Sequence, residues 1–466
     1  MKTYKLLLML ASPLCIASCQ EDEFKVNDIS DEVNNVTMPM AKLRSGDGSA
    51  YFTTVDVVTA DTTVALHLEL DEPSKTNISG TLAYGDASAV EEYNSTYGTS
   101  YEVFPESLVT FDDPAVVIAG KKKSTDAVLN ISVNESIEHD VTYAIPVTVT
   151  TDDADVTLAG SSHLVFVKNR VGVHQCTEKP NGYKIFSCME TGTANPLFHL
   201  AFELESSGAP LFDYVIVFSS KMRWDPETKT IRIAPCNCQE AISANYEKFI
   251  KPLHDRGIKV ILSLLSSGES DTGMQMSCVE ESTSKSVARI IADYCNTHHL
   301  DGVFFDEEYG VYRDDIPGVS YYPSNRQISR LMYETKMAMP DKEVIAYNYS
   351  YTSRLYAVDG VYPKDYVDWV VNDYSSWSTG SYEGGMPKSK MTPCSMNCAN
   401  AYYARWTATY SNMSRLKSEG WGGFMIYCFD YATGNWDTQW SYTKNVATYL
   451  FDDTLIDTGY RPVAEW

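Results

Sequence analysis

Short apolar runs alternate with amphipathic stretches over the C-terminal part of the chain, and this alternation restricts the fold more than any other feature. Helical spacing lies between the runs, for example over 242–254 and 284–298. Strands that are apolar on both faces and are linked by helices belong to parallel sheets. About eight such units over roughly 280 residues predict a TIM (β/α)8 barrel over 180–466. The runs are YKIFSCME, DYVIVFSS, GIKVILSLL, LDGVFFDEE, EVIAYNYS, VDWVVNDY and WGGFMIYCF.

A different pattern occupies 47–172, where polar and apolar residues alternate along short segments. In TTVALHLEL the apolar residues Val64, Leu66 and Leu68 fall on one face of a strand together with Leu70. Similar runs recur along the segment, turn residues separate them, and helical signals are scarce. We therefore expect a small all-β sandwich of antiparallel strands in front of the barrel.

Polar residues follow several of the expected barrel strands. The carboxyl ends of the strands carry the active site of a TIM barrel, so these residues are the first candidates for one. The clusters are DEE at 306–308, NYS at 348–350 and NDY at 372–374.

The acidic cluster at the end of the fourth run divides between the two faces of its strand. Because side chains alternate along a strand, Phe304, Asp306 and Glu308 are predicted to share the inward face. Glu307 then points outward, toward the surrounding helices. Two inward carboxyl groups so close together raise the pKa of at least one of them.

The charge balance and the cysteines exclude some classes of partner. The chain has 37 Lys+Arg against 62 Asp+Glu and a formal net charge of −25. An acidic surface repels phosphate backbones, so nucleic acid is not expected as a partner. Two close cysteine pairs, Cys236 with Cys238 and Cys394 with Cys398, have no nearby histidine. We therefore expect no metal site, and cysteine spacing does not reveal a disulfide pattern.

The amino terminus has the features of an export signal. Small residues after a short apolar run lead to Cys19 in the sequence IASC, which resembles a bacterial lipobox. The acids that follow, QEDEF, resemble the export tag of Bacteroides-type surface lipoproteins, and 47–172 resembles an accessory domain of such proteins. We expect 1–19 to be a lipoprotein signal with a lipidated Cys19, and 20–46 to be a flexible acidic tether. An ordinary cleaved secretory signal is the alternative.

The segment LDGVFFDEEYG, residues 300–310, resembles the signature D-G-x-D-x-D-x-E of glycoside hydrolase family 18. The matching residues are Asp301, Gly302, Asp306 and Glu308. Phe304 stands where that family has its first inward Asp. Over about 183–466 the chain is similar to bacterial endo-β-N-acetylglucosaminidases of the endoglycosidase F/H type. Supporting blocks in the same order are FDYVIVFSSKMRWDPETKT, PLHDRGIKVILSLL, RLMYETKMAMPDK, AVDG with DYVDWVVNDY, and GWGGFMIYCFD.

This resemblance implies a retaining hydrolysis in which the substrate supplies the nucleophile. The acetamide oxygen of an N-acetylglucosamine would attack its own anomeric carbon, while Glu308 protonates the leaving oxygen and later deprotonates water. Asp306 would hold the acetamide N–H and offset the developing positive charge. Tyr374 matches the family tyrosine that steadies the acetamide, and Asn372 is a weaker match. This chemistry implies no metal and no organic cofactor.

Further candidates for substrate binding lie at strand ends or beside the acid. Glu190 is a candidate because a lone buried acid is costly. Tyr309 directly follows the expected acid, and the others are as compatible with barrel packing as with substrate contact. The full set is Glu190, Tyr309, Tyr347, Asn348, Tyr349 and Tyr427.

The sequence therefore predicts an endo-β-N-acetylglucosaminidase on the outer-membrane surface, held there by its lipid anchor alone. Its expected partners are N-linked glycans and glycoproteins, cut in the N,N′-diacetylchitobiose core, and the resemblance implies oligomannose or hybrid glycans. Neighbouring glycan-import proteins are further candidate partners.

Two alternative functions are open. Phe304 cannot accept a proton, so the relay that an Asp provides there is absent, and a non-catalytic glycan-binding lipoprotein on the same barrel is the first alternative. The intact Asp306 and Glu308 argue against it. The second alternative is a chitinase of the same family, although chitinases usually keep the full D-x-D-x-E.

Overall fold

The computed structural model describes residues 38–46, 52–112, 115–117, 119–158, 162–173, 179–373, 377–432 and 435–466. The expected signal 1–19 with Cys19, most of the expected tether and Tyr374 lie outside the described residues. All elements named below belong to one unit, Pro39–Trp466. No helix within the described ranges is both long enough and apolar enough to cross a membrane.

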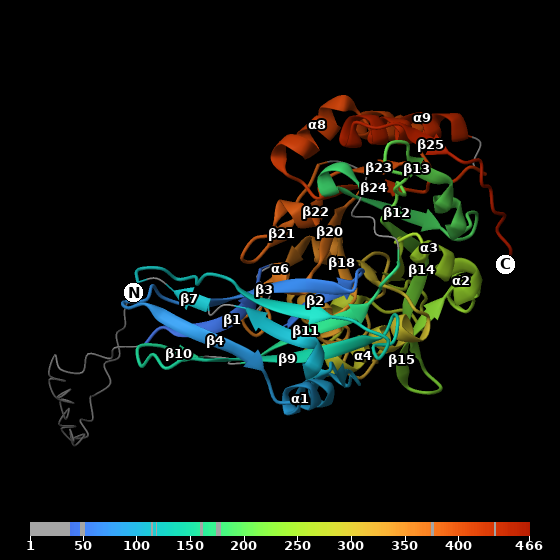
Figure 1. The fold of residues 1–466 in the computed structure, drawn as a ribbon. Coiled ribbons are helices and arrows are strands. Elements are labelled where there is room, and N and C mark those ends of the chain that lie inside the picture. Colours follow the sequence, from blue (N-terminus) through green and yellow to red (C-terminus); the bar gives the residue numbers. More distant parts are fainter. Residues whose placement is uncertain are drawn as a thin grey trace, which may run out of the picture. The chain divides into compact units, whose positions relative to one another are not determined.

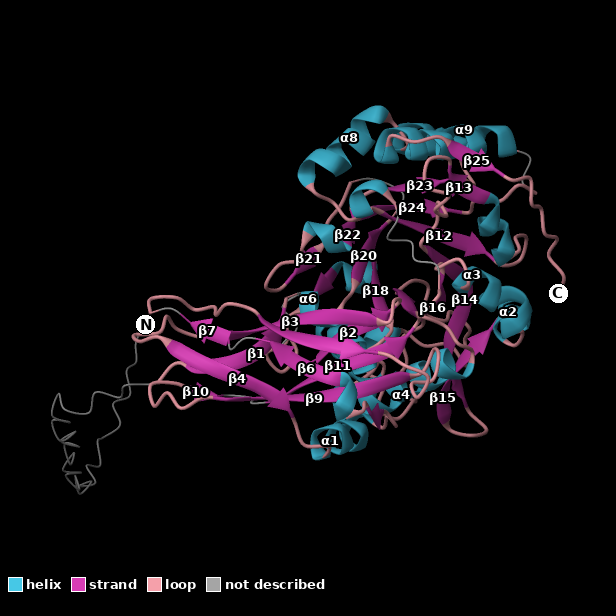
Figure 2. Ribbon diagram, in the orientation of Figure 1, coloured by secondary structure: helices cyan, strands magenta, loops and turns pink. Residues whose placement is uncertain are grey.

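Two β-sheets precede the barrel. In Figure 2 this part of the chain is drawn mostly as strands, in magenta, with the helix α1 (Ser88–Tyr97) beside them. One sheet contains, in order, β10 (Thr157–Leu158), β1 (Met40–Ser45), β3 (Asp61–Leu70), β8 (Ala127–Ser132) and β6 (Val109–Asp112). The other contains β2 (Phe52–Val57), β11 (Ser162–Asn169), β9 (Thr142–Thr150), β4 (Ile78–Tyr84) and β7 (Ala115–Val117), with β5 (Glu102–Val103) beside β9.

The sandwich core comes from the alternating residues of both sheets. Leu66 and Leu68 of β3 pack in one cluster with Ile145 and Val147 of β9, and all four are fully buried. This confirms the predicted all-β sandwich. Neighbouring strands are mostly antiparallel as expected, but three pairs run parallel, namely β11 with β2, β1 with β10 and β5 with β9.

The remaining chain forms the predicted barrel of parallel strands (Figure 1). In order around the barrel these are β12 (Lys184–Glu190), β14 (Tyr214–Asp225), β16 (Lys259–Leu265), β17 (Gly302–Asp306), β18 (Glu343–Asn348), β20 (Trp369–Asn372), β22 (Met391–Thr392) with β23 (Ser395–Asn397), and β24 (Gly423–Tyr427). Pairing of β24 with β12 joins the last strand to the first. The fold is therefore a TIM barrel preceded by a β-sandwich.

The seventh strand of the barrel was missing from the apolar runs picked out in the sequence. It is broken into β22, which pairs with β20, and β23, which pairs with β24. Pro393 lies between the two halves and has no backbone N–H to give to a ladder. The interruption leaves each half too short to show a strand pattern in the sequence.

Helices connect the strands and cover the outside of the barrel. They are α2 (Asn237–Ser243), α3 (Lys251–His254), α4 (Glu281–Thr297), α5 (Asn325–Ala338), α6 (Pro363–Tyr366), α7 (Ala401–Thr407), α8 (Tyr410–Glu419) and α9 (Trp436–Val446). The helix expected over 242–254 is divided, because α2 ends at Ser243 and a π-helical turn, Tyr246–Ile250, precedes α3. The helix expected over 284–298 is α4.

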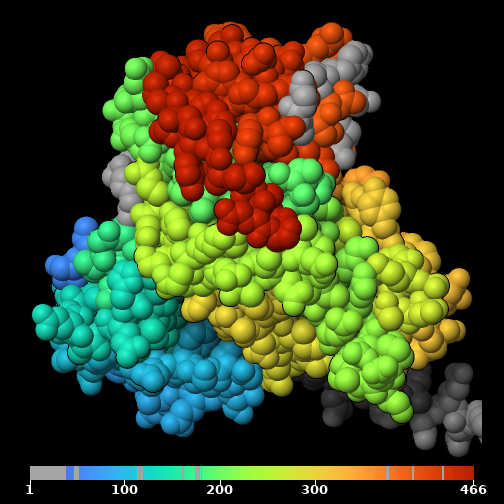
Figure 3. Space-filling view, turned by 90° about the vertical axis from the view of Figure 1, so that its right-hand side faces the viewer, coloured from blue at the N-terminus to red at the C-terminus, as the bar shows by residue number. Residues whose placement is uncertain are grey.

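Short strand pairs and a hairpin complete the architecture. In the hairpin, β14 runs beyond the barrel and pairs antiparallel with β15 (Thr230–Pro235). The short pairs are β13 (Phe202–Leu204) with β25 (Leu455–Asp457), and β19 (Arg354–Leu355) with β21 (Ser381–Tyr382). Figure 3 shows the C-terminal segment, in red, lying over the yellow-green surface. There the Trp466 ring lies 5.7 Å from that of Phe249.

The inside of the barrel is a packed core and not a pore. Phe186, Tyr214, Ile261 and Phe304 project inward from successive strands and are buried in one cluster. The opposite faces of the same strands pack against the helices, as Phe305 does beside Phe304. The alternation along β17 is therefore the one that the sequence predicts.

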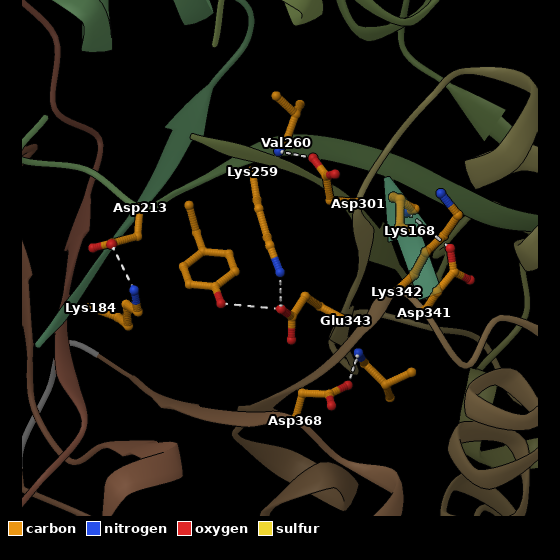
Figure 4. Close-up of polar contacts among 12 residues, drawn as sticks. Lys168, Lys184, Asp213, Lys259, Val260, Asp301, Asp341, Lys342, Glu343 and Asp368 are labelled. Atoms are coloured by element: carbon orange, nitrogen blue, oxygen red, sulfur yellow. Dashed lines mark hydrogen bonds and ion pairs between the residues drawn. The ribbon is translucent and has the colours of Figure 1, made fainter. Parts of the chain in front are cut away.

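Charged residues gather at the amino-terminal ends of the barrel strands, opposite the ends that carry a TIM-barrel active site (Figure 4). Lys259 Nζ lies 2.6 Å from Glu343 Oε1. Asp301 accepts a hydrogen bond from the backbone N–H of Val260 at 2.7 Å, which fixes β17 against β16. Burial acts to raise the pKa of Asp301, but His254, Arg170 and Lys342 together hold it far below its usual range.

Candidate active site

A cavity of ≈ 210 Å³ lies at the carboxyl end of β17. Phe304 and Asp306, two residues apart on that strand, both line it, and Glu308 lines it from the loop that follows. The described residues that line it are Cys188, Phe218, Phe304, Asp306, Glu308, Tyr309, Tyr347, Met425 and Tyr427. The end of β17 and the loop that follows it thus bring both candidate acids to one place.

Asp306 is a buried carboxyl group with an unused acceptor. Its side chain is 6% exposed, and its Oδ1 atom has no hydrogen-bond partner among the described residues. The pKa of Asp306 is raised well above its ordinary range, first by burial and then by the negative charges of Glu308, Glu307 and Asp373. A group that donates a hydrogen bond into the cavity would satisfy this oxygen.

Glu308 is less buried and lies at the mouth of the cavity. Burial raises the pKa of its carboxyl group, and the nearby charge of Asp373 raises it further. A hydrogen bond between Glu308 and the hydroxyl of Tyr309 acts in the opposite direction. A carboxyl group that keeps its proton to higher pH than an ordinary glutamate is suited to general acid catalysis.

Glu307, between these two residues, points away from the cavity. It is 1% exposed and accepts hydrogen bonds from the Ser266 hydroxyl and from the Ser277 backbone N–H, each at 2.6 Å. Burial raises the pKa of Glu307, and the hydrogen bonds partly oppose that effect. Glu307 therefore joins the end of β17 to the loop that follows β16.

Two glycines let these neighbouring loops approach closely. A Cβ atom on Gly268 would lie 2.7 Å from the carbonyl oxygen of Tyr309, and one on Gly310 would lie 1.9 Å from Oε1 of Gln275. The backbone N–H of Val311 donates to Ser267 O at 3.1 Å. The loop that carries Glu308 and Tyr309 is therefore held against the loop before α4.

Tyr347, at the end of β18, forms the aromatic wall of the cavity. Its ring centroid lies 5.4 Å from that of Phe304 and 5.9 Å from that of Tyr349, with which it is stacked. Its hydroxyl donates to Asp373 Oδ1 at 2.8 Å. Burial and the negative charge of Asp373 raise the pKa of Tyr347, so its hydroxyl stays protonated.

Glu190 and Tyr427, predicted separately as candidates, form a pair on the adjacent strands β12 and β24. The Tyr427 hydroxyl donates to Glu190 Oε1 at 2.6 Å. Tyr427 lines the cavity, whereas Glu190 lies behind it and orients its hydroxyl. The hydrogen bond from Tyr427 thus reduces the free-energy cost of removing the Glu190 carboxyl group from water.

Asn348 and Asn372 lie apart from the cavity lining and bond to each other. The Asn348 side-chain amide donates to Asn372 Oδ1 at 2.8 Å, and the Asn372 amide donates to the carbonyl oxygen of Pro393 at 2.9 Å. These bonds connect β18 and β20 to the interrupted seventh strand.

The structure brings together five of the residues singled out in the sequence. These are Asp306, Glu308, Tyr309, Tyr347 and Tyr427. Tyr349 and Glu190 touch this group through single contacts. Tyr374, expected to be catalytic, and the lipidation residue Cys19 lie outside the described residues.

Sequence reasoning missed several residues of the site. Cys188, Phe218 and Met425 line the cavity, and the signal for Cys188 and Met425 was their inward position on β12 and β24. Asp373, whose charge acts on Asp306 and Glu308, was not singled out individually. It follows Asn372, where β20 ends, so strand alternation does not place its side chain.

The described residues contain no group of three or more His, Cys, Asp or Glu side chains that could hold a metal ion. The acids of the cavity are instead arranged for proton transfer and charge stabilisation on a bound substrate.

Comparisons with known proteins agree with this geometry. The chain is 35% identical over 293 residues to endo-β-N-acetylglucosaminidase F1 of Elizabethkingia meningoseptica, a match that covers 62% of this chain and 84% of that protein. A family model described as a "-like, N-terminal domain" matches residues 33–156, largely within the β-sandwich.

Solved structures of EndoBT-3987 from Bacteroides thetaiotamicron are also similar. The structure with a Man5GlcNAc product has a TM-score of 0.79 and 26% identity, and the match covers 91% of this chain and 99% of that one. The structure with a Man9GlcNAc2Asn substrate has a TM-score of 0.74 and 25% identity, covering 91% and 97%.

A closed parallel barrel with two perturbed carboxyl groups in a cavity at its carboxyl end, together with these matches, defines a glycoside hydrolase. The chain belongs to the endo-β-N-acetylglucosaminidases of the endoglycosidase F/H type.

Proposed function

We propose that this protein hydrolyses the N,N′-diacetylchitobiose core of oligomannose or hybrid N-linked glycans and leaves one N-acetylglucosamine on the protein. The observation that supports this most is the pairing of Asp306 and Glu308 in one cavity, where one Asp306 oxygen has no hydrogen-bond partner among the described residues. The oligomannose substrate and product bound in EndoBT-3987 support the choice of glycan.

In this proposal the acetamide oxygen of the substrate attacks the anomeric carbon of its own sugar and forms an oxazolinium ring. The glycosidic C–O bond breaks, and its oxygen takes the proton of Glu308. The resulting carboxylate of Glu308 then removes a proton from water, which opens the ring. Two inversions at the anomeric carbon give retention of configuration.

Asp306 has the complementary role. Its buried oxygen accepts the acetamide N–H, which turns the acetamide oxygen toward the anomeric carbon. As the ring becomes positively charged, the carboxylate form of Asp306 stabilises it in a site of low dielectric constant. Tyr374 is assigned to the acetamide by family resemblance, since it lies outside the described residues.

Phe304 fills the position of the acid that chitinases of family 18 use as a proton relay. Its ring is 2% exposed and packs against Tyr347 beside Asp306. A phenyl group there removes water from Asp306 and so adds to the rise in its pKa. We propose that desolvation replaces the relay as the means of tuning this acid.

Digestion of an oligomannose glycoprotein, followed by mass spectrometry, tests the proposal. The expected result is a protein that retains one N-acetylglucosamine and a released glycan with one N-acetylglucosamine at its reducing end. A folded sample that binds the glycan without any change in mass would instead support a glycan-binding protein. Faster hydrolysis of chitin oligomers than of N-glycans would support a chitinase.

We also propose that 1–19 is a lipoprotein signal and that a lipid on Cys19 anchors the protein to the outer-membrane surface. The lipobox-like IASC and the acids after it support this. The expected tether 20–46 is shortened to the part that precedes β1, because β1 (Met40–Ser45) pairs with β3 in the sandwich. In this arrangement 47–172 is an accessory domain and 180–466 is the catalytic domain. The glycans that the enzyme releases pass to neighbouring import proteins. Cys19→Ala should move the protein from the membrane fraction to the soluble fraction, and protease treatment of intact cells should digest only the anchored form.

A further inference from the structure

The segment 307–324, which connects the end of β17 to α5, carries three exposed tyrosines in addition to Tyr309 of the cavity. Tyr312, Tyr321 and Tyr322 are 46%, 49% and 76% exposed. The ring centroids of Tyr312 and Tyr321 are 6.2 Å apart, and those of Tyr321 and Tyr322 are 5.4 Å apart. We call these three residues the tyrosine ledge. Side chains of this size are normally covered, so their grouping calls for an explanation.

The tyrosine ledge continues from the catalytic cavity. Tyr312 is a neighbour of Tyr351, and the pKa of the Tyr351 hydroxyl is raised first by burial and then by Tyr312. Tyr351 follows two residues after Tyr349, whose ring stacks on the cavity residue Tyr347. Tyr309, which lines the cavity, begins the same segment as the ledge. A ligand that extends out of the cavity along this segment would therefore meet the ledge.

The backbone beneath the tyrosine ledge is fixed at several points. The N–H of Ser320 donates to the carbonyl oxygen of Cys278 at 2.8 Å, and the N–H of Ser324 donates to that of Ser277 at 2.9 Å. The N–H of Tyr322 donates to the Ser320 hydroxyl at 3.1 Å. A surface held in this way loses little conformational entropy when a ligand binds.

The chemistry of the tyrosine ledge fits sugar rings better than a peptide. Neighbouring rings are inclined by 62° and 83°, so each presents a separate flat face with a hydroxyl group at its edge. The aliphatic residues of the same segment, Ile316 and Val319, are buried and offer no pocket for apolar side chains. Pyranose rings have one C–H face and a polar rim, which matches an aromatic face with a hydroxyl beside it.

We propose that the tyrosine ledge binds outer hexose residues of the glycan while its chitobiose core occupies the catalytic cavity. This inference rests on the proposed function, because it identifies the occupant by its covalent connection to that core. The ledge then sets a preference for extended glycans over trimmed ones without contact with the reacting atoms.

The test compares Man9GlcNAc2Asn with the same substrate trimmed to its three-mannose core. In Tyr321→Ala/Tyr322→Ala the KM for the large glycan should rise about tenfold, as expected for the loss of two stacking contacts. The KM for the trimmed glycan and both kcat values should stay near those of the wild type. Tyr321→Phe/Tyr322→Phe keeps the rings and should restore affinity. Tyr460→Ala removes an exposed tyrosine of the C-terminal segment and is the matched control.

Binding measured by calorimetry in a Glu308→Gln background separates this inference from the proposed function. If the wild type cleaves neither substrate, the proposed function fails, and the ledge is still tested by its effect on affinity for the large glycan. Equal losses on both substrates, or no loss on the large one, would overturn the inference. So would a loss confined to protein-linked glycans, which would indicate that the ledge contacts the polypeptide.

Discussion

At the scale of single residues, three neighbouring acids have three different environments. Asp306 is buried in the cavity with an oxygen that is unpartnered within the described residues, and Glu307 is buried on the opposite face with both oxygens hydrogen-bonded. Glu308 is only half-buried and bonds to Tyr309. The acceptor oxygen of Asp306 is suited to a hydrogen bond from the substrate, and the two bonded oxygens of Glu307 are suited to a structural role. The partial exposure of Glu308 is suited to proton exchange. The three residues are all acids, and their different surroundings therefore decide which role each one has.

Glu308→Gln should remove the proton that the leaving oxygen needs. We expect kcat to fall by about 10²–10⁴-fold, the usual contribution of a general acid. The substitution is nearly isosteric, so KM and the affinity for the intact glycan should change little. Initial rates on a labelled oligomannose glycopeptide, with affinity measured separately, check both expectations. A larger loss in Glu307→Gln than in Glu308→Gln would contradict the assignment of the two faces.

Asp373→Asn should change the pH dependence of the reaction. The negative charge of Asp373 helps to raise the pKa of Glu308, so its removal lowers that pKa. Glu308 must be protonated to act as an acid, and the alkaline limb of kcat/KM should therefore move to lower pH. Asparagine keeps an oxygen that can accept the Tyr347 hydroxyl hydrogen bond. An alkaline limb that stays in place or moves to higher pH would show that Asp373 does not act on Glu308.

Asp306→Asn should lose hydrolysis and gain stability. Because burial raises the folded-state pKa of Asp306 above its unfolded value, its ionised form costs stability at neutral and alkaline pH. That cost disappears as the pH falls below the unfolded value of about 3.9. Thermal unfolding should show a higher Tm for the variant at pH 8 and a smaller difference near pH 4. Asp293→Asn, on the exposed face of α4, is the control, and an equal shift there would argue against this explanation.

At the scale of elements, Glu307 connects β17 to the loop before α4. Glu307→Ala removes the acceptor of the Ser266 hydroxyl and of the Ser277 N–H, and these donors are then buried without a partner. The expected cost is about 1–3 kcal/mol of unfolding free energy, with a lower kcat because Glu308 is less well held. Glu307→Gln keeps an acceptor and should lose less. Urea denaturation together with hydrogen exchange at the Ser277 amide measures both effects.

Most of the barrel follows from the sequence, and the exceptions have physical causes. Runs such as that of β17 are apolar on both faces and end in polar residues, which is enough to predict a strand and the end that carries the site. The strand broken at Pro393 has no such run. Alternation places residues only within a strand, so it fails for Asp373, which follows the end of β20. The Glu190–Tyr427 bond depends on strands far apart in sequence, which only barrel closure brings together.

At the scale of the whole molecule, the β-sandwich packs against the amino-terminal end of the barrel. Phe52 and Phe166 of the sandwich belong to the same core cluster as barrel residues. Asp341 accepts hydrogen bonds from the hydroxyls of Tyr101 at 3.0 Å and Thr142 at 2.8 Å. It also lies 3.0 Å from Lys168 Nζ. A domain that only separated the barrel from a membrane would not need contacts of this kind.

The ion pair between Lys168 and Asp341 makes this contact sensitive to acid. Burial acts to raise the pKa of Asp341, but Lys168, with Lys342 and Thr142, holds it far below its usual range. A depressed folded-state pKa gives stability that is complete above the unfolded pKa of about 3.9 and is lost as the pH falls through the folded value. The contribution of the pair should therefore be constant near neutral pH and decrease below about pH 4.

Lys168→Met tests whether the two domains unfold together. The substitution removes the cation that is paired with buried Asp341 and leaves the weaker effect of Lys342, at an expected cost of about 3 kcal/mol near neutral pH and less at pH 3. All 8 tryptophans lie between Trp224 and Trp466, in the barrel, so their fluorescence reports on the barrel alone. If the sandwich and barrel share one cooperative transition, a substitution in the sandwich must lower the fluorescence midpoint in urea. An unchanged midpoint, with loss of β-sheet circular dichroism at lower urea, would mean that the sandwich unfolds first and does not support the barrel. Lys42→Met, on the sandwich strand β1, is the control and should leave both midpoints in place.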